Sequence, residues 1–264
     1  MKIEQTTQKE TVCSIEEFIT DVLEKADADG ALVAMSGGID SSTVASLAVR
    51  ALGKENVKAL ILPSESNRAS AREDAVAHAK SLEIEYTVID IERIVRLFVD
   101  KAGINFDSES SEKITVGNTR VRTRAVLNYM FANAENRVVL GTGNKSEALT
   151  GYFTKYGDQA VDCNPIGDLY KTEVRELARE IGVPEKIIEK PPSAGMWDGQ
   201  EDEEEIGIPY ETLDKVLEKC IEGKAQPETV AHDVGVSAEG VRRVIELHRK
   251  SEHKRKIPPS PDLD

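Results

Sequence analysis

The chain has 264 residues, of which 39% are hydrophobic and 5% aromatic, and its formal net charge is −14. This length and apolar content are sufficient for one large folded domain and exclude a disordered chain. A protein this acidic repels nucleic-acid phosphates. A polyanionic ligand therefore requires a local basic site or a metal ion.

The three cysteines, Cys13, Cys163 and Cys220, are widely spaced and form no CxxC pair. Scattered cysteines in an odd number argue against a disulfide framework and against a cysteine-rich zinc site. The polar N-terminus lacks the apolar stretch of a secretory signal, and no apolar run approaches the ~20 residues that span a bilayer. We therefore expect a cytoplasmic protein without a membrane segment.

The first half of the chain alternates between helix and strand patterns. In chain order we expect a helix at 14–26, a strand at 31–35, a helix at 40–52, a strand at 57–62, a helix at 70–82, a strand at 84–89, helices at 91–101 and 117–134, and a strand at 137–141. Capping-box patterns predict helix starts at Ser14 and Ser70, and Gly53 is placed to end the second helix. Short apolar strands between helices predict an α/β fold with a doubly wound parallel sheet.

The pattern changes after Gly151. A polar loop at 154–164, a helix at 168–181 and an acidic loop at 191–207 are followed by helices at 210–221, 227–234 and 237–252. We interpret the acidic run at 201–205 as part of a solvated loop. The expected organisation is a single domain, 1–264, with an α/β core at 13–190, a C-terminal helical part at 208–256 and a frayed tail at 257–264.

Ligands of such sheets bind beyond the carboxyl ends of the strands, here the turns after Met35 and Leu140. The first turn reads SGGIDSS at 36–42, where glycines let a ligand approach and a helix N-terminus favours an anion. The Walker lysine is missing, and Asp40 stands there instead. Because a carboxylate repels phosphate, Mg²⁺ between them is the natural arrangement. The plainer alternative is that Asp40 only caps the helix.

Two motif blocks carry a resemblance to a known family. SGGxDSS resembles the signature of the PP-loop ATP pyrophosphatases, which cleave ATP between its α and β phosphates. A second block, GTGNKSE at 141–147, continues into GYFTKYGD at 151–158 and LYK at 169–171. Together, and over about residues 12–255, they resemble the ammonia-dependent NAD synthetases. The resemblance implies a Rossmann-like, adenine nucleotide alpha hydrolase-like fold with C-terminal helices.

The resemblance also implies roles for individual residues. ATP would be bound by Ala34, Met35, Ser36, Gly37, Gly38, Ile39, Asp40, Ser41, Thr142, Lys171 and Ser193. Mg²⁺ would be shared by Asp40 and Glu147, and deamido-NAD would be bound by Arg122, Tyr129, Lys155, Asp162, His253 and Lys254. Many members have glycine where Ala34 stands, and the small alanine is expected to cost little. The catalytic set is Asp40, Lys171 and Asp158, where Asp158 is our hypothesis for the group that holds ammonium.

The implied reaction begins when the nicotinate carboxylate of deamido-NAD attacks the α-phosphorus of ATP. Ammonia then displaces AMP and gives NAD, with positioning and charge stabilisation as the protein's contribution. The phosphate motif begins at residue 36, which leaves no room upstream for a glutamine-hydrolysing domain. We therefore expect free ammonia, or a separate donor subunit, as the nitrogen source. In the resembling family the helix that carries Arg122 lies at a two-fold interface, which implies a homodimer with shared sites.

Plainer interpretations stay open for several of these residues. Glu147 is also explained as an acid favoured by the first turn of a helix, and Lys155 and Lys171 as solvated lysines. On a helix, Arg120 and Arg124 share a face and Arg122 points roughly 200° round, so Arg122 has a different job from its neighbours. The alternative for this run is two surface arginines and one interface ion pair.

Three other functions agree with parts of the sequence. A tRNA-modifying PP-loop enzyme shares the first motif, but the net charge of −14 and the scattered cysteines argue against it. Residues 229–244 resemble a helix-turn-helix, which would fit a nucleotide-sensing regulator that binds DNA, although short helical hairpins often give such strings. The third is a nucleotide-binding module without turnover. The presence of both Asp40 and Glu147 argues against it.

Overall fold

The computed structural model of the chain describes residues 5–67, 69–104, 108–197, 199–261 and 263. Within them, one parallel sheet has the strand order β3-β2-β1-β4. The strands are β1 (Gly30–Ala34), β2 (Val57–Ile61), β3 (Glu85–Val88) and β4 (Arg137–Leu140). Ala31 of β1 pairs with Val57 of β2 and with Val138 of β4, so β1 is central and its carboxyl end lies between those of its neighbours.

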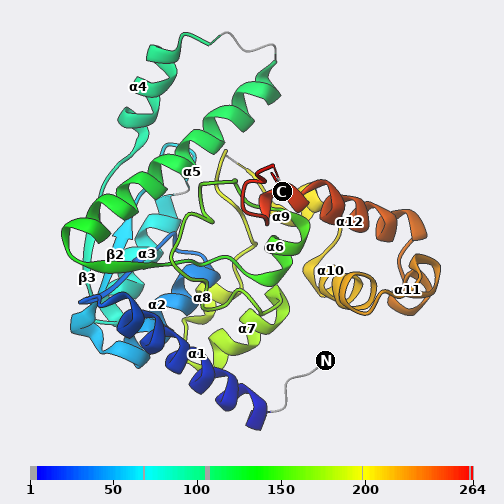
Figure 1. Cartoon of the computed structure of the whole chain (residues 1–264), viewed down its shortest axis with the longest axis horizontal. Helices are drawn as coiled ribbons and strands as arrows, with labels where there is room; N and C mark the ends of the chain where they lie inside the picture. The colour runs from blue at the N-terminus through cyan, green and yellow to red at the C-terminus, as the bar shows by residue number, and fades with distance from the viewer. Residues whose placement is uncertain (1–4, 68, 105–107, 198, 262, 264) are drawn as a thin grey trace.

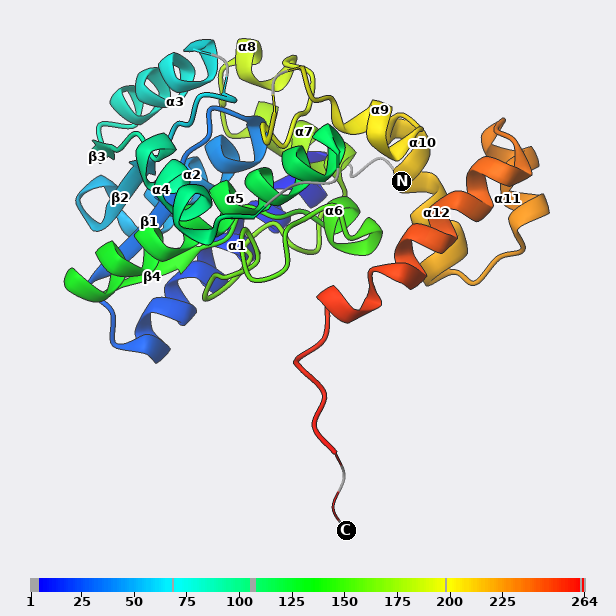
Figure 2. The ribbon, with the colours of Figure 1, turned by 90° about the horizontal axis from the view of Figure 1, so that it is seen from above.

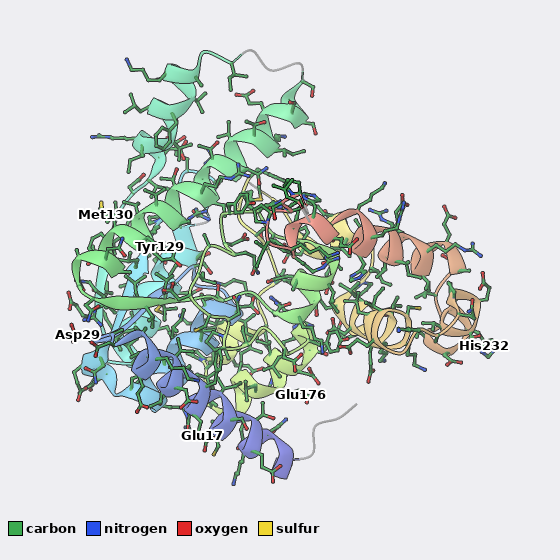
Figure 3. All side chains as sticks on the ribbon, viewed as in Figure 1. Glu17, Asp29, Tyr129, Met130, Glu176 and His232 are labelled. Carbon is green, nitrogen blue, oxygen red and sulfur yellow. The ribbon has the colours of Figure 1, made fainter. Side chains whose placement is uncertain are left out.

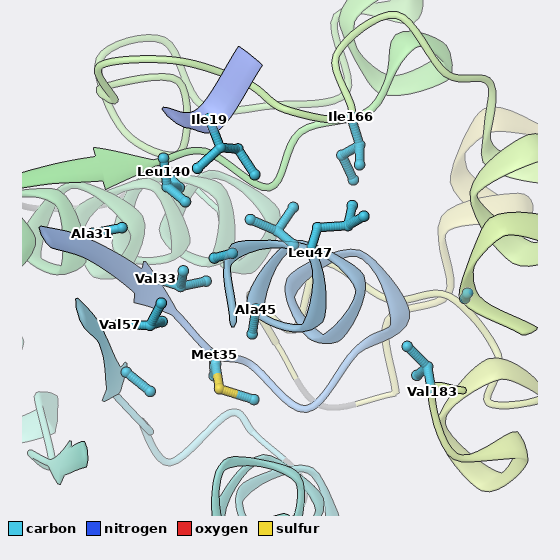
Figure 4. Packing of buried hydrophobic residues seen from close by; sticks show 14 of the residues in the cluster. Ile19, Ala31, Val33, Met35, Ala45, Leu47, Val57, Leu140, Ile166 and Val183 are labelled. Atoms are coloured by element: carbon cyan, nitrogen blue, oxygen red, sulfur yellow. The ribbon is translucent and has the colours of Figure 1, made fainter. Parts of the chain in front are cut away.

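Helices cover both faces of this sheet (Figure 1). Alternate strand residues such as Val33 and Leu140 share a core with α1 (Gln5–Ala26), α2 (Ile39–Leu52), α3 (Ala69–Ser81) and α7 (Lys171–Glu180). Figure 4 shows Ile19 of α1 and Leu47 of α2 in that core. Leu32 and Leu60 face the other way, toward α4 (Glu92–Ala102) and α5 (Glu109–Ala134). The predicted doubly wound α/β fold is therefore confirmed.

The C-terminal helices form a third core beside the sheet. They are α10 (Tyr210–Val216), the π-helical turn Leu217–Glu222, α11 (Pro227–Val234) and α12 (Ala238–Lys250), and they project to one side of the molecule in Figures 1 and 2. Tyr210, Leu213 and Val241 are fully buried within this group. This core is distinct from the two on the faces of the sheet, and the division into an α/β core at 13–190 and a helical part at 208–256 stays a prediction. The short helices α6 (Lys145–Thr150), α8 (Glu185–Ile188) and α9 (Asp202–Ile206) lie in the connections.

Several predicted element boundaries are wrong. α1 begins at Gln5, so Ser14 is interior and caps nothing, because the buried stripe of Val12, Ile15 and Ile19 extends the helix in the N-terminal direction. Ser70 likewise lies inside α3. α5 begins at Glu109 rather than 117, capped by the Ser108 hydroxyl, which accepts the N–H of Ser111. Gly53 ends α2 as predicted, with φ +82°.

The last described residues, 257–261 and 263, are exposed and run away from the helices (Figure 2), where a frayed tail was expected. Among the described helices, none has both the length and the apolar character needed to cross a bilayer.

Candidate active site

A tight turn joins β1 to α2 and is held by its own serines. Ser36 N–H donates to Ser41 Oγ (3.2 Å), and Ser41 Oγ donates to the carbonyl of Gly38 (3.2 Å). Gly37 has φ +79°, and a Cβ there would lie 2.0 Å from the carbonyl oxygen of Ala71, so only glycine fits. No described side chain caps α2 at Gly38, which leaves first-turn N–H groups free for an anion.

Lys190 is a neighbour of this turn that the sequence did not point to. Its Nζ donates to the carbonyl of Gly37 (3.0 Å) and pairs with Asp74 of α3 (2.6 Å). A contact between residues so distant in the chain has no sequence pattern. Lys190 therefore supports the turn from outside and places a cation beside it.

Asp40 and Glu147 converge on one buried lysine. Lys171 at the start of α7 is 2% exposed, and its Nζ lies 2.5 Å from Asp40 Oδ2 and 3.7 Å from Glu147 Oε1. Asn144 Nδ2 donates to Asp40 Oδ1 (3.1 Å), and the ring of Tyr210 lies 5.5 Å from Nζ. The two motif blocks of the sequence are thus joined at one point, beside the phosphate-binding turn.

Glu147 serves two purposes at once. In the first turn of α6 it forms a capping box with Asn144: its N–H donates to Asn144 Oδ1 (3.0 Å), and its Oε2 accepts the N–H of Asn144 (3.2 Å). The plain interpretation of an early-helix acid is therefore right, but Oε1 also faces Lys171. The same capping box fixes the Asn144 amide, which in turn orients Asp40.

The charges of this cluster do not balance. Burial, and then the charge of Asp40, raise the pKa of Glu147 to about 8, although Lys171 opposes the rise. Burial alone would lower the pKa of Lys171, but Asp40 and Glu147 outweigh it and raise that pKa. Burial also raises the pKa of Asp202, whose charge acts on Lys171 and Glu147. With all these carboxylates ionised, one ammonium group would leave an excess of negative charge in a desolvated place, and the raised pKa of Glu147 reflects this crowding.

That excess fits a divalent cation. Carboxylate oxygens are preferred Mg²⁺ ligands, and Mg²⁺ in nucleotide enzymes usually takes one or two of them with phosphate oxygens and water. Among the described residues, no group of three or more His, Cys, Asp or Glu is arranged to hold a metal ion. Asp40 and Glu147 therefore fit a shared site that nucleotide phosphates complete, rather than an all-protein cage.

Four candidate residues gather around the loop at 151–158. Arg122 of α5 donates through Nε and Nη2 to the carbonyl of Lys155 (3.3 and 3.2 Å). Lys254, after α12, donates to the carbonyls of Gly151 (2.8 Å) and Phe153 (2.7 Å). Thr154 N–H donates to Asp158 Oδ1 (2.8 Å), and desolvation raises the pKa of Asp158 to about 6 although solvent reaches its carboxylate. His253 is exposed on the turn beside Lys254.

Tyr129 and Asp162 meet at another place, the outer edge of β4, where Cys163 forms a bridge to Leu140. The Tyr129 hydroxyl donates to Asp162 Oδ1 (2.9 Å), and Val139 N–H donates to Asp162 Oδ2 (2.7 Å). Burial, and then that hydrogen bond, raise the pKa of Tyr129. Both oxygens of Asp162 thus hold the following loop against the sheet. Thr142 is half-buried in the turn after β4.

The arginines of α5 divide as helical geometry predicts. Arg122 is exposed, whereas Arg120 makes two hydrogen bonds to buried Glu92 (3.2 and 3.1 Å). Arg124 donates to the carbonyl of Leu62 (3.0 Å), and burial lowers its pKa to about 10. The alternative of two surface arginines is therefore wrong, because Arg120 and Arg124 are the partly buried pair.

The acidic loop docks on the α/β core through backbone carbonyls. Arg120 donates to the carbonyl of Met196 (3.0 Å), and Ser66 Oγ to that of Gly195 (2.9 Å). Ser193, a predicted ATP contact, is exposed in this loop, and its Oγ accepts the N–H of Gly195 (3.2 Å). Asp202 lies within the acidic run but is only 3% exposed, so the interpretation of a wholly solvated run is wrong there.

The preformed turn on β1, the carboxylates from two strand-end turns and the Rossmann-like sheet define a nucleotide-binding α/β enzyme of the PP-loop type. A sequence model described as NAD synthase matches residues 11–258. The chain belongs to the NAD synthase family. The expectation of an NAD-synthesising ligase is thereby confirmed, and it replaces the tRNA-modifying and DNA-binding alternatives.

Individual relatives agree with this assignment. The chain is 51% identical over 248 residues to the NH(3)-dependent NAD(+) synthetase of Methanosarcina acetivorans, covering 94% of this chain and 95% of that protein. The structure of NMN synthetase from Francisella tularensis has a TM-score of 0.85 and 35% identity, over 97% of this chain and 99% of that chain. The NH3-dependent NAD synthetase from Campylobacter jejuni, in complex with the nitrate ion, has a TM-score of 0.80 and 29% identity, over 97% and 99%.

Proposed function

We propose that this protein converts deamido-NAD to NAD with ATP, Mg²⁺ and free ammonia, releasing AMP and pyrophosphate. The observation that carries the proposal is the convergence of Asp40, Glu147 and Lys171 beside the preformed turn that follows β1. It gives a chain of the NAD synthase family a place for a triphosphate and its metal ion.

The residues at the turn divide the work on ATP. Asp40 and Glu147 would hold Mg²⁺, which when bound neutralises charge on the phosphates. Lys171 stabilises the negative charge that collects on the departing pyrophosphate, while the free N–H groups of α2 bind its oxygens. The ATP contacts are the residues already named from the resemblance, Ala34 to Ser41 with Thr142 and Ser193.

Deamido-NAD binds along the loop at 151–158 and the adjoining elements. Arg122 and Lys155 support this assignment because they touch, and Lys254 because it holds the same loop. Tyr129 and Asp162 extend the proposed surface toward the edge of β4, and His253 toward the turn after α12. Asp158 is proposed to attract ammonium and accept its proton, since it is a carboxylate whose pKa is raised to about 6 and whose Oδ1 is held by the N–H of Thr154.

The protein is proposed to act as a homodimer with sites shared across the interface. Large apolar side chains are exposed along α4 and α5, which supports a second copy as their cover. They are Leu97 (54% exposed), Phe98 (50%), Ile114 (50%), Val126 (66%) and Met130 (56%), the last labelled on α5 in Figure 3. A cytoplasmic location is part of the proposal and agrees with three free cysteines, Cys13, Cys163 and Cys220.

A product assay tests the proposal directly. The purified chain is mixed with ATP, Mg²⁺, deamido-NAD and ammonium, and NAD, AMP and pyrophosphate are expected in equal amounts. ADP as product would contradict cleavage between the α and β phosphates. A parallel reaction with the deamidated form of NMN is expected to be slower, and a faster one would assign the activity named for the Francisella tularensis protein. Glutamine in place of ammonium is expected to give no NAD.

A further inference from the structure

A buried carboxylate outside the site is tied to the helices that carry it. Asp214 of α10 is 5% exposed and belongs to the C-terminal helical part. Ser146 Oγ donates to its Oδ1 (2.5 Å), and Thr172 N–H donates to its Oδ2 (2.9 Å). Ser146 Oγ also accepts the N–H of Lys171 (2.9 Å). These three hydrogen bonds thus join four residues in one compact network.

The members of this network are sequence neighbours of the proposed catalytic groups. Ser146 precedes Glu147 in α6, and Lys171 and Thr172 begin α7. First-turn N–H groups of a helix have no partner within the helix, and a carboxylate is a favourable one. Asp214 and Ser146 supply that partner for α7 from outside it, so they fix the point from which the Lys171 side chain starts.

The ring of Tyr210 lies 5.5 Å from Lys171 Nζ, but two other contacts of α10 do not reach this point. Leu213, beside Asp214, is fully buried in the C-terminal core, and Glu211 pairs with Arg175 on the exposed side of both helices. Both contribute to packing without a hydrogen bond to the first turn of α7 or to α6. Variants of Leu213 and Glu211 therefore distinguish a general loss of stability from a loss of the alignment of Glu147 and Lys171.

We propose that Asp214 is a positioning residue for the nucleotide site: through Ser146 and the N–H of Thr172 it holds Glu147 and Lys171 in the arrangement that binds ATP and its metal ion. The proposal rests on the roles proposed above for Glu147 and Lys171. It makes the C-terminal helical part a component of the site, although none of its own helices carries the phosphate-binding turn. Groups that support metal ligands in this way typically change affinity or activity about 10–100-fold.

The test compares Asp214→Ala, Asp214→Asn and Ser146→Ala with the controls Leu213→Ala and Glu211→Gln. The first readout is calorimetric binding of a non-cleavable ATP analogue with Mg²⁺, and the second is hydrogen exchange at the amides of Lys171 and Thr172. Asp214→Ala should weaken binding about 10–100-fold and speed exchange at both amides. Asp214→Asn keeps an acceptor for Thr172 and should recover part of both losses, and Ser146→Ala should release the Lys171 amide.

The controls decide between alignment and stability. Leu213→Ala should lower the melting temperature but leave analogue binding within about twofold well below the transition, because it removes only packing. Equal weakening in Leu213→Ala and Asp214→Ala, or normal binding in Asp214→Ala, would overturn the proposal. If Asp214→Ala does not fold, Ser146→Ala carries the test alone by the same two readouts. Asp40→Asn tests the proposed metal site separately from the proposed role of Asp214. If Asp40→Asn binds the analogue normally while Asp214→Ala does not, the proposed metal site fails and the positioning role of Asp214 stands.

Discussion

Two lysines of this protein are buried among carboxylates, at opposite edges of the sheet. Lys58, near the start of β2, has a side chain 8% exposed and lies 2.9 Å from Glu85 and 2.5 Å from Glu135, with the ring of Phe131 5.4 Å away. Lys171, beyond the carboxyl ends of the strands, has the same composition of neighbours: two carboxylates and the ring of an aromatic residue.

The partners of these lysines differ in how solvent reaches them. At Lys58 the carboxylates of Glu85 and Glu135 are 65% and 30% exposed, and the hydrogen bond from Lys58 lowers the pKa of Glu135. At Lys171 burial and crowding instead raise the pKa of Glu147 to about 8. Arg137 also pairs with Glu135 (2.9 Å), so the first group has two cations for two carboxylates and serves the fold. The second carries an excess of negative charge that a ligand can relieve, which is typical of functional sites.

The largest predicted difference follows from removing one carboxylate from each group. Asp40→Asn should lower kcat about 10²–10³-fold, since a charged contact that stabilises the reacting phosphates is lost. Its melting temperature should be preserved, because one source of repulsion on Glu147 disappears as well. Glu135→Gln should leave kcat unchanged and cost about 1 kcal/mol of stability, since it weakens a satisfied pair. Activity assays and calorimetry on both variants check this, and an inactive Glu135→Gln would break the comparison.

The second prediction sharpens the contrast within the turn itself. The backbone at Gly37 is left-handed, so Gly37→Ala places a Cβ on that backbone and against Ala71. The substitution should therefore destabilise the fold by about 1–3 kcal/mol. At Gly38 the nearest atom to an added Cβ is Ser36 Oγ, at 3.3 Å, and φ is −93°. Gly38→Ala should therefore keep the melting temperature and raise the KM for ATP. Thermal unfolding and steady-state kinetics separate the two, and an unchanged KM for ATP in Gly38→Ala would refute the ligand role of Gly38.

Much of the site was accessible from the sequence, because local motifs determine local structure. The SGGIDSS turn and the Asn144–Glu147 cap are each built within a few residues, so a pattern is sufficient to recognise them. The rule that carboxyl ends of parallel strands share one edge brought the turns after Met35 and Leu140 together, and the family resemblance implied that Asp40 and Glu147 meet there. Lys190 and Asp214 were missed, because their contacts join residues far apart in the chain and leave no local pattern.

The fold shows the same limit at its boundaries. Serine followed three residues later by glutamate predicted helix starts at Ser14 and Ser70, yet both lie inside helices. Tertiary packing decided the first case, because α1 continues for as long as its apolar stripe covers the sheet. The parallel, doubly wound arrangement, in contrast, was correctly predicted from the alternation of elements.

The third prediction concerns Asp158. This carboxylate lies near cations but, unlike the carboxylates around Lys58 and Lys171, it has no close ion pair among the described residues. With a pKa of about 6, it becomes a carboxylate only as the pH rises through that value. We expect the KM for ammonium in wild type to improve across that range relative to Asp158→Asn, which should have a KM raised about tenfold at pH 7. The ratio of the two proteins cancels the speciation of ammonia. A ratio independent of pH would end the proposed role of Asp158.

The prediction with the smallest expected effect extends the comparison from the two buried lysines to a buried histidine that has no carboxylate beside it. His78 of α3 is 3% exposed and contacts Ser46 Oγ (3.1 Å) and the carbonyl of Ser42 (3.3 Å) on α2. Burial lowers its pKa below 6.5, although the bond to Ser42 opposes this. Below pH 6.5 the unfolded chain therefore binds the proton more tightly than the native protein, and stability falls as the pH falls toward the native pKa.

His78→Gln keeps a hydrogen-bonding side chain at that position but cannot be protonated. Wild type should lose stability more steeply than this variant between pH 6.5 and pH 5, by about 1.4 kcal/mol for each unit by which the native pKa lies below 6.5. Denaturant unfolding at several pH values measures the difference in slope. Parallel stability curves would mean that the pKa of His78 is the same in the folded and the unfolded states. Burial without a neighbouring carboxylate would then leave protonation unchanged, and the contrast of His78 with Lys58 and Lys171 would be lost.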